Sequence, residues 1–285
     1  MKIREKILIL FIFLIFLIFL IFVYSKLAPN FSQNFAPNLE SGDKGFKKIP
    51  QILEKKDVDK IMEWIREKQY KNVYQYIVNH SSVLSRIKSF SGISSEYVFQ
   101  DYSYFILKSR VHTCHRDNNG TFFNPNQKYP SYTIIFYLED IGQGLDVIPG
   151  SHLLKTPFIS NSTVPIDVQI GDAILFDANL IHAGSIHPYD SIRIQMKISH
   201  PLDISTLSFY QDFHKVLNKP NTSSNYFLHL QKWFSCHFPI FSDVFMEQED
   251  KQSWRGSETA TVSWAQKIFS FFVYGDADYY DIPNI

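Results

Sequence analysis

The chain has little of two features that define whole classes of protein, namely cysteine and net charge. Only Cys114 and Cys236 occur among 285 residues, which excludes a small domain stapled by several disulfides. We expect both to be buried thiols, with a single long-range bridge as the alternative. The 28 basic and 28 acidic side chains cancel, so nucleic acid is not a favoured partner. No internal repeat of about 20 to 50 residues is visible.

Apolar and aromatic residues are abundant. Hydrophobic residues make up 45% of the chain and aromatic residues 16%, which is ample material for a buried core. This composition excludes a collagen, a coiled coil or a disordered chain. The length allows one large globular domain or two small ones.

The N-terminus has the composition of a membrane span. Residues 7–24 carry no charge, consist largely of Ile, Leu and Phe, and follow Lys2, Arg4 and Lys6. As a helix they would reach about 27 Å, enough to cross a hydrocarbon core, and the basic flank favours a cytoplasmic N-terminus. We predict a single-pass anchor over residues 1–24, with the C-terminal domain lumenal or extracellular. A cleaved signal peptide, which would give a secreted protein, is the alternative.

Beyond the anchor the composition changes abruptly. Residues 25–50 contain little to bury and are predicted to form a flexible stem, with residues 51–285 as the domain. Sequons for N-glycosylation are consistent with passage through the secretory pathway. They begin at Asn30, Asn79, Asn119, Asn161 and Asn221.

The domain is predicted to be mainly β with flanking helices. Helical spacing begins after Asp57, which we expect to cap the helix, and continues to about residue 87. A β-rich core over residues 95–200 suggests a barrel or sandwich. Its strands are predicted at residues 102–107, 132–138, 145–148, 173–176 and 192–198. A C-terminal helical region, residues 203–275, is predicted to hold helices at 205–217, 226–236 and 259–274.

Candidate metal ligands lie in the β-rich core. His115 and Asp117 are two residues apart, so on a strand both side chains point to one face. With His182 they would form a two-histidine, one-carboxylate triad that leaves coordination positions open, as in oxygen-activating Fe(II) centres. Arg193 follows on what we expect to be the adjacent strand, where a guanidinium can hold the far carboxylate of a dicarboxylate.

Three blocks together resemble the phytanoyl-CoA dioxygenase-like branch of the Fe(II)- and 2-oxoglutarate-dependent dioxygenases. They are residues 115–117, residues 144–152 with a Pro-Gly-Ser-His ending, and the stretch from Gly171 through His182 to Arg193. The resemblance implies a double-stranded β-helix, a jelly-roll or cupin-like barrel. It also implies Fe(II) on His115, Asp117 and His182, and 2-oxoglutarate on Arg193. Turnover would use dioxygen and yield succinate and carbon dioxide as a substrate is hydroxylated.

Further side chains are candidates for cosubstrate contact, and two positions depart from the family pattern. Tyr104 and Lys108 precede the site, where Tyr102 would share their face, and Gln195 follows Arg193. Gln195 replaces the small polar residue expected after the arginine, and His187 replaces an expected Asn. His112 lies an odd number of residues from Asp117 and should face away, while His152 is expected to shape its turn.

The substrate has no signature in the sequence. A lumenal anchored enzyme favours a lipid, a peptide, a glycan or another small molecule presented at the membrane. Two other functions stay open: a non-catalytic β-barrel that binds a ligand, and a type II membrane glycosyltransferase that uses Asp276 and Asp278 as a metal-nucleotide motif. The aromatic segment 264–274 is expected to pack in the core rather than on a bilayer.

Overall fold

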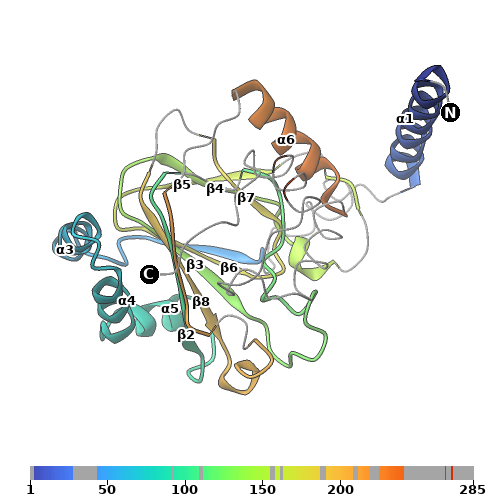
Figure 1. The fold of residues 1–285 in the computed structure, drawn as a ribbon. Coiled ribbons are helices and arrows are strands. Elements are labelled where there is room, and N and C mark those ends of the chain that lie inside the picture. The colour runs from blue at the N-terminus through green and yellow to red at the C-terminus, as the bar shows by residue number, and fades with distance from the viewer. Residues whose placement is uncertain are drawn as a thin grey trace.

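The structure is a computed structural model of the whole chain. It describes residues 3–27, 44–91, 93–108, 112–154, 158–160, 163–186, 191–207, 211–218, 225–240, 267 and 271. Figure 1 shows two layers of β-strands, with a group of helices against one layer and a single helix over the other.

Helices α3 (Lys55–Arg66), α4 (Tyr70–Asn79) and α5 (Val83–Ser91) occupy the region where the sequence predicted helices. Asp57 does not cap α3, because the N-cap is Glu54. Asp57 lies in the first turn instead, where its Oδ2 accepts a hydrogen bond from the Glu54 backbone N–H at 3.0 Å. The predicted cap position was therefore wrong by one helical turn.

The major sheet holds six strands in the described residues, in the order β1-β6-β3-β8-β2-β9. Their bounds are β1 Phe46–Ile49, β2 Val98–Ile106, β3 Tyr132–Tyr137, β6 Ala173–Asp177, β8 Arg193–Ser199 and β9 Phe213–Leu217. One face of this sheet packs against α3, α4 and α5 through a large apolar cluster that includes Ile61, Val73, Phe105 and Met196.

The minor sheet covers the opposite face of the major sheet. It consists of β4 (Gly142–Val147), β5 (Val164–Val168) and β7 (His182–Gly184), in the order β5-β4-β7. A second apolar cluster, with Val147, Ile174 and Phe176 among its members, fills part of the space between the sheets. The mainly β fold with flanking helices is confirmed, and its two facing sheets are consistent with a double-stranded β-helix.

Two segments form strands where the sequence predicted something else. The helix predicted over residues 205–217 is wrong, because residues 213–217 form β9, which pairs in parallel with β2. Burial alternates along β9, with Phe213, Lys215 and Leu217 buried, which is the period of a strand. Residues 46–49, predicted as stem, form β1 on the edge of the major sheet. The helix predicted over 259–274, with its aromatic segment, lies outside the described residues apart from 267 and 271.

Helix α6 (Asn225–His237) confirms the helix predicted at 226–236, and a disulfide fixes it to the domain. Cys114 is bonded to Cys236, with their Cα atoms 4.8 Å apart, so the expectation of two free thiols was wrong. The Ser235 hydroxyl also accepts a hydrogen bond from the Cys114 backbone N–H at 2.8 Å. Sequence separation alone gave no reason to pair these residues; the packing of α6 against residue 114 brings them together.

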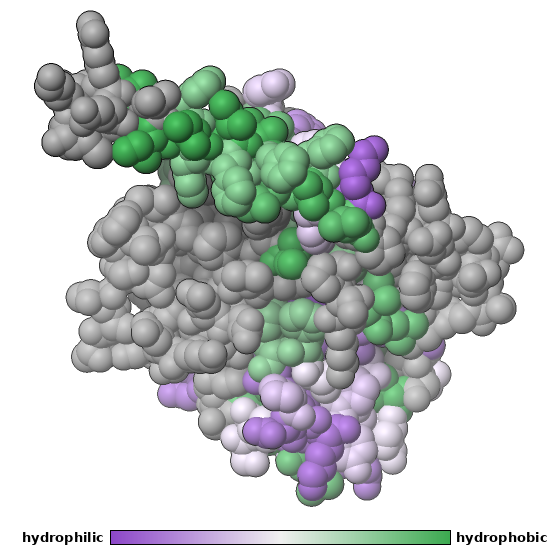
Figure 2. Space-filling model, turned by 90° about the vertical axis from the view of Figure 1, so that its right-hand side faces the viewer, coloured by the Kyte–Doolittle hydropathy of each residue, from purple (hydrophilic) through white to green (hydrophobic). Residues whose placement is uncertain are grey.

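Helix α1 (Ile3–Leu27) contains the predicted anchor. Its residues 9–27 are long and apolar enough to cross a membrane by length and composition, with none of that stretch buried. Figure 2 shows α1 as a continuous band of hydrophobic surface. The C-terminal end of α1 contacts the domain, since the Tyr24 hydroxyl donates to the Phe158 carbonyl at 2.9 Å and the Tyr24 ring lies 5.9 Å from that of Phe238.

Candidate metal centre

Backbone pairing brings His115 and His182 side by side. The two residues form an isolated antiparallel bridge, in which each backbone N–H donates to the other residue's carbonyl at 3.0 Å. Asp117 continues the alignment, because its N–H donates to the Ala178 carbonyl at 2.9 Å. Backbone hydrogen bonds therefore hold residues 115–117 beside residues 178–182, although the two segments are distant in the chain.

Both imidazoles are oriented in the same way by their own backbone. The Nδ1 atom of His115 lies 2.9 Å from the Thr113 carbonyl, and the Nδ1 atom of His182 lies 2.9 Å from the Leu180 carbonyl. A carbonyl only accepts, so in each neutral ring the proton sits on Nδ1 and Nε2 keeps a free lone pair. This is the tautomer that a metal requires when it binds through Nε2.

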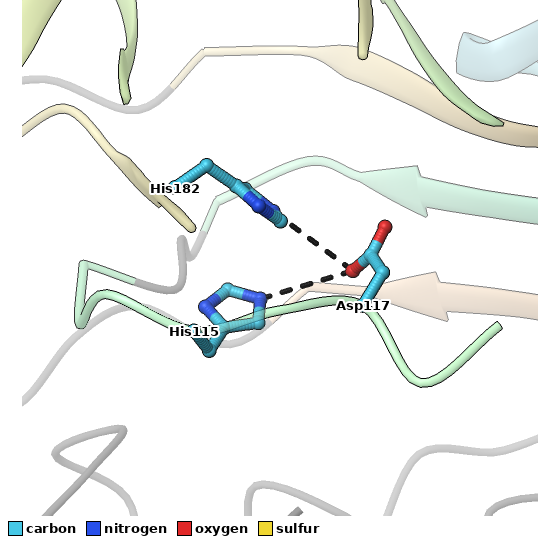
Figure 3. Close-up of side chains that lie close together, drawn as sticks. All are labelled: His115, Asp117 and His182. Atoms are coloured by element: carbon cyan, nitrogen blue, oxygen red, sulfur yellow. Dashed lines mark ion pairs between the residues drawn. The ribbon is translucent and has the colours of Figure 1, made fainter. Parts of the chain in front are cut away.

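The two Nε2 atoms converge on one carboxylate oxygen. Each lies 3.9 Å from Oδ1 of Asp117, as the dashed lines in Figure 3 mark. The ligand atoms of His115, Asp117 and His182 all lie within 4.8 Å of one another. Two imidazole nitrogens and one carboxylate oxygen with this spacing fit a divalent iron that has bonds of about 2 Å to each.

The other oxygen of Asp117 is held by three side chains of the major sheet. Oδ2 lies 2.6 Å from Nζ of Lys197, accepts a hydrogen bond from the Thr133 hydroxyl at 2.5 Å and lies 3.5 Å from Nε2 of Gln195. Lys197 also donates to the Thr133 hydroxyl and to Oδ1 of Asn119, each at 2.9 Å. The carboxylate thus presents Oδ1 to the histidines and Oδ2 to the sheet.

Charges around the carboxylate determine its protonation. Burial alone would raise the pKa of Asp117, but the Lys197 ammonium and the two imidazoles outweigh burial and hold the pKa well below its usual value. Burial lowers the pKa of His182, which favours its neutral form. An ionised carboxylate and a neutral imidazole are the states that bind a metal.

Arg193 is also inside the fold, next to a second polar group. It is paired with Tyr137 across β8 and β3, and both side chains are buried. Among the described residues the Tyr137 hydroxyl has no hydrogen-bond partner, and burial raises its pKa, so it stays protonated. A buried hydroxyl left without a partner costs about 1–3 kcal/mol. A guanidinium beside an unpaired hydroxyl fits the distal carboxylate of 2-oxoglutarate.

The remaining candidates are placed as follows. Tyr104 is buried and pairs with Gln195 across β2 and β8, whereas Lys108 is exposed. His112 turns away from the triad and bonds through Nε2 to Gln231 of α6 at 2.8 Å. His152 follows the Pro-Gly-Ser turn in a short 3-10 helix, Ser151–Leu153. His187 and the motif Asp276–Asp278 lie outside the described residues.

Sequence reasoning missed Lys197 and Thr133. The signal for Lys197 was available, because Arg193, Gln195 and Lys197 alternate along one strand and so share one face. Thr133 carried no signal of its own, since a threonine in an apolar strand is common.

A second group, Asp101, Asp212 and His214, also has metal-ligand types close together. It lies at the surface, where Asp212 is exposed and the side chain of Asp101 is 47% exposed. The two ring nitrogens of His214 already contact Ser103 at 2.8 Å and Asp101 at 3.1 Å. This group is therefore a weaker candidate for metal binding than the buried triad.

Comparison with protein families identifies the enzyme class. Residues 100–192 match the family described as phytanoyl-CoA dioxygenase (PhyH), a stretch that contains all three members of the triad. The match confirms the resemblance seen in the motifs. The matched stretch is of the phytanoyl-CoA dioxygenase-like type, and the protein is an Fe(II)- and 2-oxoglutarate-dependent enzyme, with iron, 2-oxoglutarate and dioxygen as the cofactor and cosubstrates.

Solved structures with a similar arrangement are distant in sequence. The non-heme alpha ketoglutarate dependent epimerase SnoN from nogalamycin biosynthesis is 14% identical, with a TM-score of 0.44 over 58% of this chain and 82% of that chain. HygX from Streptomyces hygroscopicus, with iron bound, is 12% identical, with a TM-score of 0.39 over 61% and 88%. No curated protein matches the chain. The family match and the residues of the site therefore indicate the function.

Proposed function

We propose that this protein is a membrane-anchored oxygenase that hydroxylates a substrate presented at the membrane, with His115, Asp117 and His182 as its iron ligands. The observation that supports this most directly is the convergence of two imidazole Nε2 atoms on one oxygen of a buried carboxylate. Three protein ligands on one side of an ion leave the opposite side for 2-oxoglutarate and dioxygen. When bound, the iron and 2-oxoglutarate together supply the oxidising chemistry.

The protein's own contribution is ligand orientation. Backbone carbonyls fix the tautomer of both histidines, and the sheet fixes Asp117 through its second oxygen. Lys197 offsets the buried negative charge, so the carboxylate stays ionised. Burial of the site excludes water from the reacting groups.

Arg193 and Tyr137 are proposed to bind the distal carboxylate of 2-oxoglutarate. The guanidinium supplies charge-assisted hydrogen bonds, and the Tyr137 hydroxyl gains the partner that it lacks among the described residues. Replacement of Arg193 by Met should raise the KM for 2-oxoglutarate at least about tenfold, since a charged hydrogen bond contributes about 1.5–3 kcal/mol. Lys108→Met is the matched control, because Lys108 is exposed and should leave that KM unchanged.

Membrane anchoring and a lumenal domain are supported by three features. Helix α1 is apolar and exposed, and its end contacts the domain at Phe158 and Phe238. The disulfide joins α6 to the residue before His115 and is typical of an oxidising compartment. Tyr226, Leu230 and Trp233 expose one apolar face of α6, with Trp233 58% exposed. A lipid, or a glycan or peptide held at the bilayer, is the proposed substrate class.

The test is turnover of 2-oxoglutarate by the full chain in nanodiscs with Fe(II). Wild type should release succinate in the presence of membrane lipids or glycolipids, and His115→Ala or Asp117→Ala should reduce release to background. His112→Ala is the control, because His112 is bonded away from the triad. Full turnover in both triad variants would refute the ligand assignment. Protease protection in sealed vesicles tests the topology, and digestion of the domain from the cytosolic side would refute a lumenal location.

A further inference from the structure

Lys197 is a charged residue buried in the middle of the major sheet, where a lysine is rarely found. It is 1% exposed and lies on β8, between β3 and β2. Its direct cross-strand partner is Thr133 on β3, and the Thr133 hydroxyl is bonded to Asp117. The strand register therefore places the Lys197 ammonium next to Asp117. An ammonium has three donors, and oxygens of Asp117, Thr133 and Asn119 lie within hydrogen-bond distance.

The contacts of Lys197 give the two oxygens of the Asp117 carboxylate different environments. Oδ2 is 2.6 Å from the ammonium and is also bonded by Thr133, whereas Oδ1 is 3.9 Å from the Nε2 atom of each histidine. Rotation of the carboxylate would break the contacts of Oδ2 with Lys197 and Thr133. The arrangement thus leaves a single oxygen for a metal and discourages binding through both oxygens.

The same contacts matter before any metal binds. A buried carboxylate without a counter-charge is strongly unfavourable, and removal of one member of a buried ion pair is strongly destabilising. Here the ammonium supplies the positive charge that a metal ion would otherwise supply. A carboxylate balanced in this way keeps its position beside the two histidines.

We propose that Lys197 is a positioning residue that holds Asp117 as a one-oxygen ligand and keeps the three ligands assembled in the metal-free protein. The inference depends on the proposed role of His115, Asp117 and His182 as metal ligands. Lys197 would hold the three ligands in place before iron binds. It would also prevent the second oxygen of Asp117 from taking a coordination position on the metal.

The test uses Co(II) alone as the probe, added anaerobically to the full chain in nanodiscs. Lys197→Met removes the charge at similar length, and Lys197→Arg retains the charge. Metal-free Lys197→Met should unfold roughly 5–10 °C below wild type, and Co(II) should raise its unfolding temperature by more than it raises that of wild type. The Co(II) d–d absorption should also change in shape and intensity, because Asp117 is free to bind through both oxygens.

Controls separate this inference from the proposed function. Lys215→Met makes the same substitution at another buried lysine, on β9, and should retain the wild-type Co(II) spectrum and the wild-type temperature shift. Lys197→Arg should stay close to wild type in its spectrum. If wild type binds no Co(II), or if His115→Ala binds it equally well, the proposed metal site fails.

Other outcomes decide the inference itself. If wild type binds Co(II), and Lys197→Met has the same spectrum and the same Co(II)-induced shift as wild type, Lys197 is only a structural ion pair and the inference is overturned. Should Lys197→Met not fold, Thr133→Val removes the hydrogen bond from Thr133 to Oδ2 and keeps the charge. The proposal then requires a changed Co(II) spectrum in Thr133→Val, and an unchanged spectrum overturns it.

Discussion

Removal of the Cys114–Cys236 disulfide should destabilise the domain more than any single contact around it. The bridge closes a loop with a sequence separation of 122, and loop-closure entropy for that length corresponds to about 5 kcal/mol. Most of the β core and the whole triad lie inside that loop. The double variant Cys114→Ala/Cys236→Ala should therefore unfold roughly 10–20 °C below wild type.

The bridge should also affect the site, because His115 directly follows Cys114. Without the bridge, α6 is attached to this segment by weaker contacts, such as the 2.8 Å hydrogen bond from the Cys114 N–H to Ser235. We expect the double variant to bind Co(II) more weakly even at temperatures where it is folded. Loss of position at His115, rather than loss of a ligand, is the physical reason.

The assay is thermal unfolding of the full chain in nanodiscs, together with Co(II) titration and mass mapping of alkylated cysteines. Ser235→Ala is the matched control, since it removes the neighbouring hydrogen bond and keeps the bridge, and it should cost about 1 kcal/mol. Wild-type protein whose bridge has been reduced should behave like the double variant. Alkylation of both cysteines in protein isolated from cells, or a loss below about 1 kcal/mol in the double variant, would refute the reasoning.

Three further predictions follow from single positions. Asn119 is fully buried and its sequon should carry no glycan in folded protein, whereas the exposed Asn79 is open to modification; glycopeptide mapping checks both, and a glycan on Asn119 would contradict the structure. Gly171→Ala should lower the unfolding temperature, because φ is +85° and an added Cβ would lie within 2.4 Å of the Leu53 carbonyl oxygen; an unchanged temperature in calorimetry would contradict this. Burial raises the pKa of Tyr74 to about 12, so its contribution to stability is complete below pH about 10 and is lost as pH rises toward 12. Tyr74→Phe should flatten this alkaline loss, as followed by circular dichroism, and an identical alkaline profile would count against the assignment.

Much of the central fold could be predicted because the relevant signals are local. The stretches around Ile134, Leu175 and Ile194 are short runs of apolar and β-branched residues between turn residues, and each forms a strand of the major sheet. Strand β9 was missed because its sequence, Phe213 to Leu217, is also compatible with a helix. Its pairing with β2, which no local pattern reveals, decides the outcome.

The candidate site was predictable only in part. His115, Asp117, His182 and Arg193 were identified from residue type, spacing and order, which together resemble one family. The common location of His115, Asp117 and His182 was an expectation until the pairing of residues 115 and 182 brought these three together. Alternation along the strand places Lys197 on the same face as Arg193 and Gln195, but its contact with Asp117 spans a separation of 80 residues and depends on strand register.

The sequence by itself determined the chemical types available: two imidazoles and a carboxylate for a metal, an arginine for a dicarboxylate, and an apolar N-terminal helix. Those properties belong to single residues or to short stretches, and folding does not change them. Only the tertiary structure decided which oxygen of Asp117 faces the histidines, which lysine balances its charge, and that Cys114 meets Cys236. Each of these depends on long-range pairing, because distances between distant residues are set by how the sheets and α6 pack together and not by any local pattern.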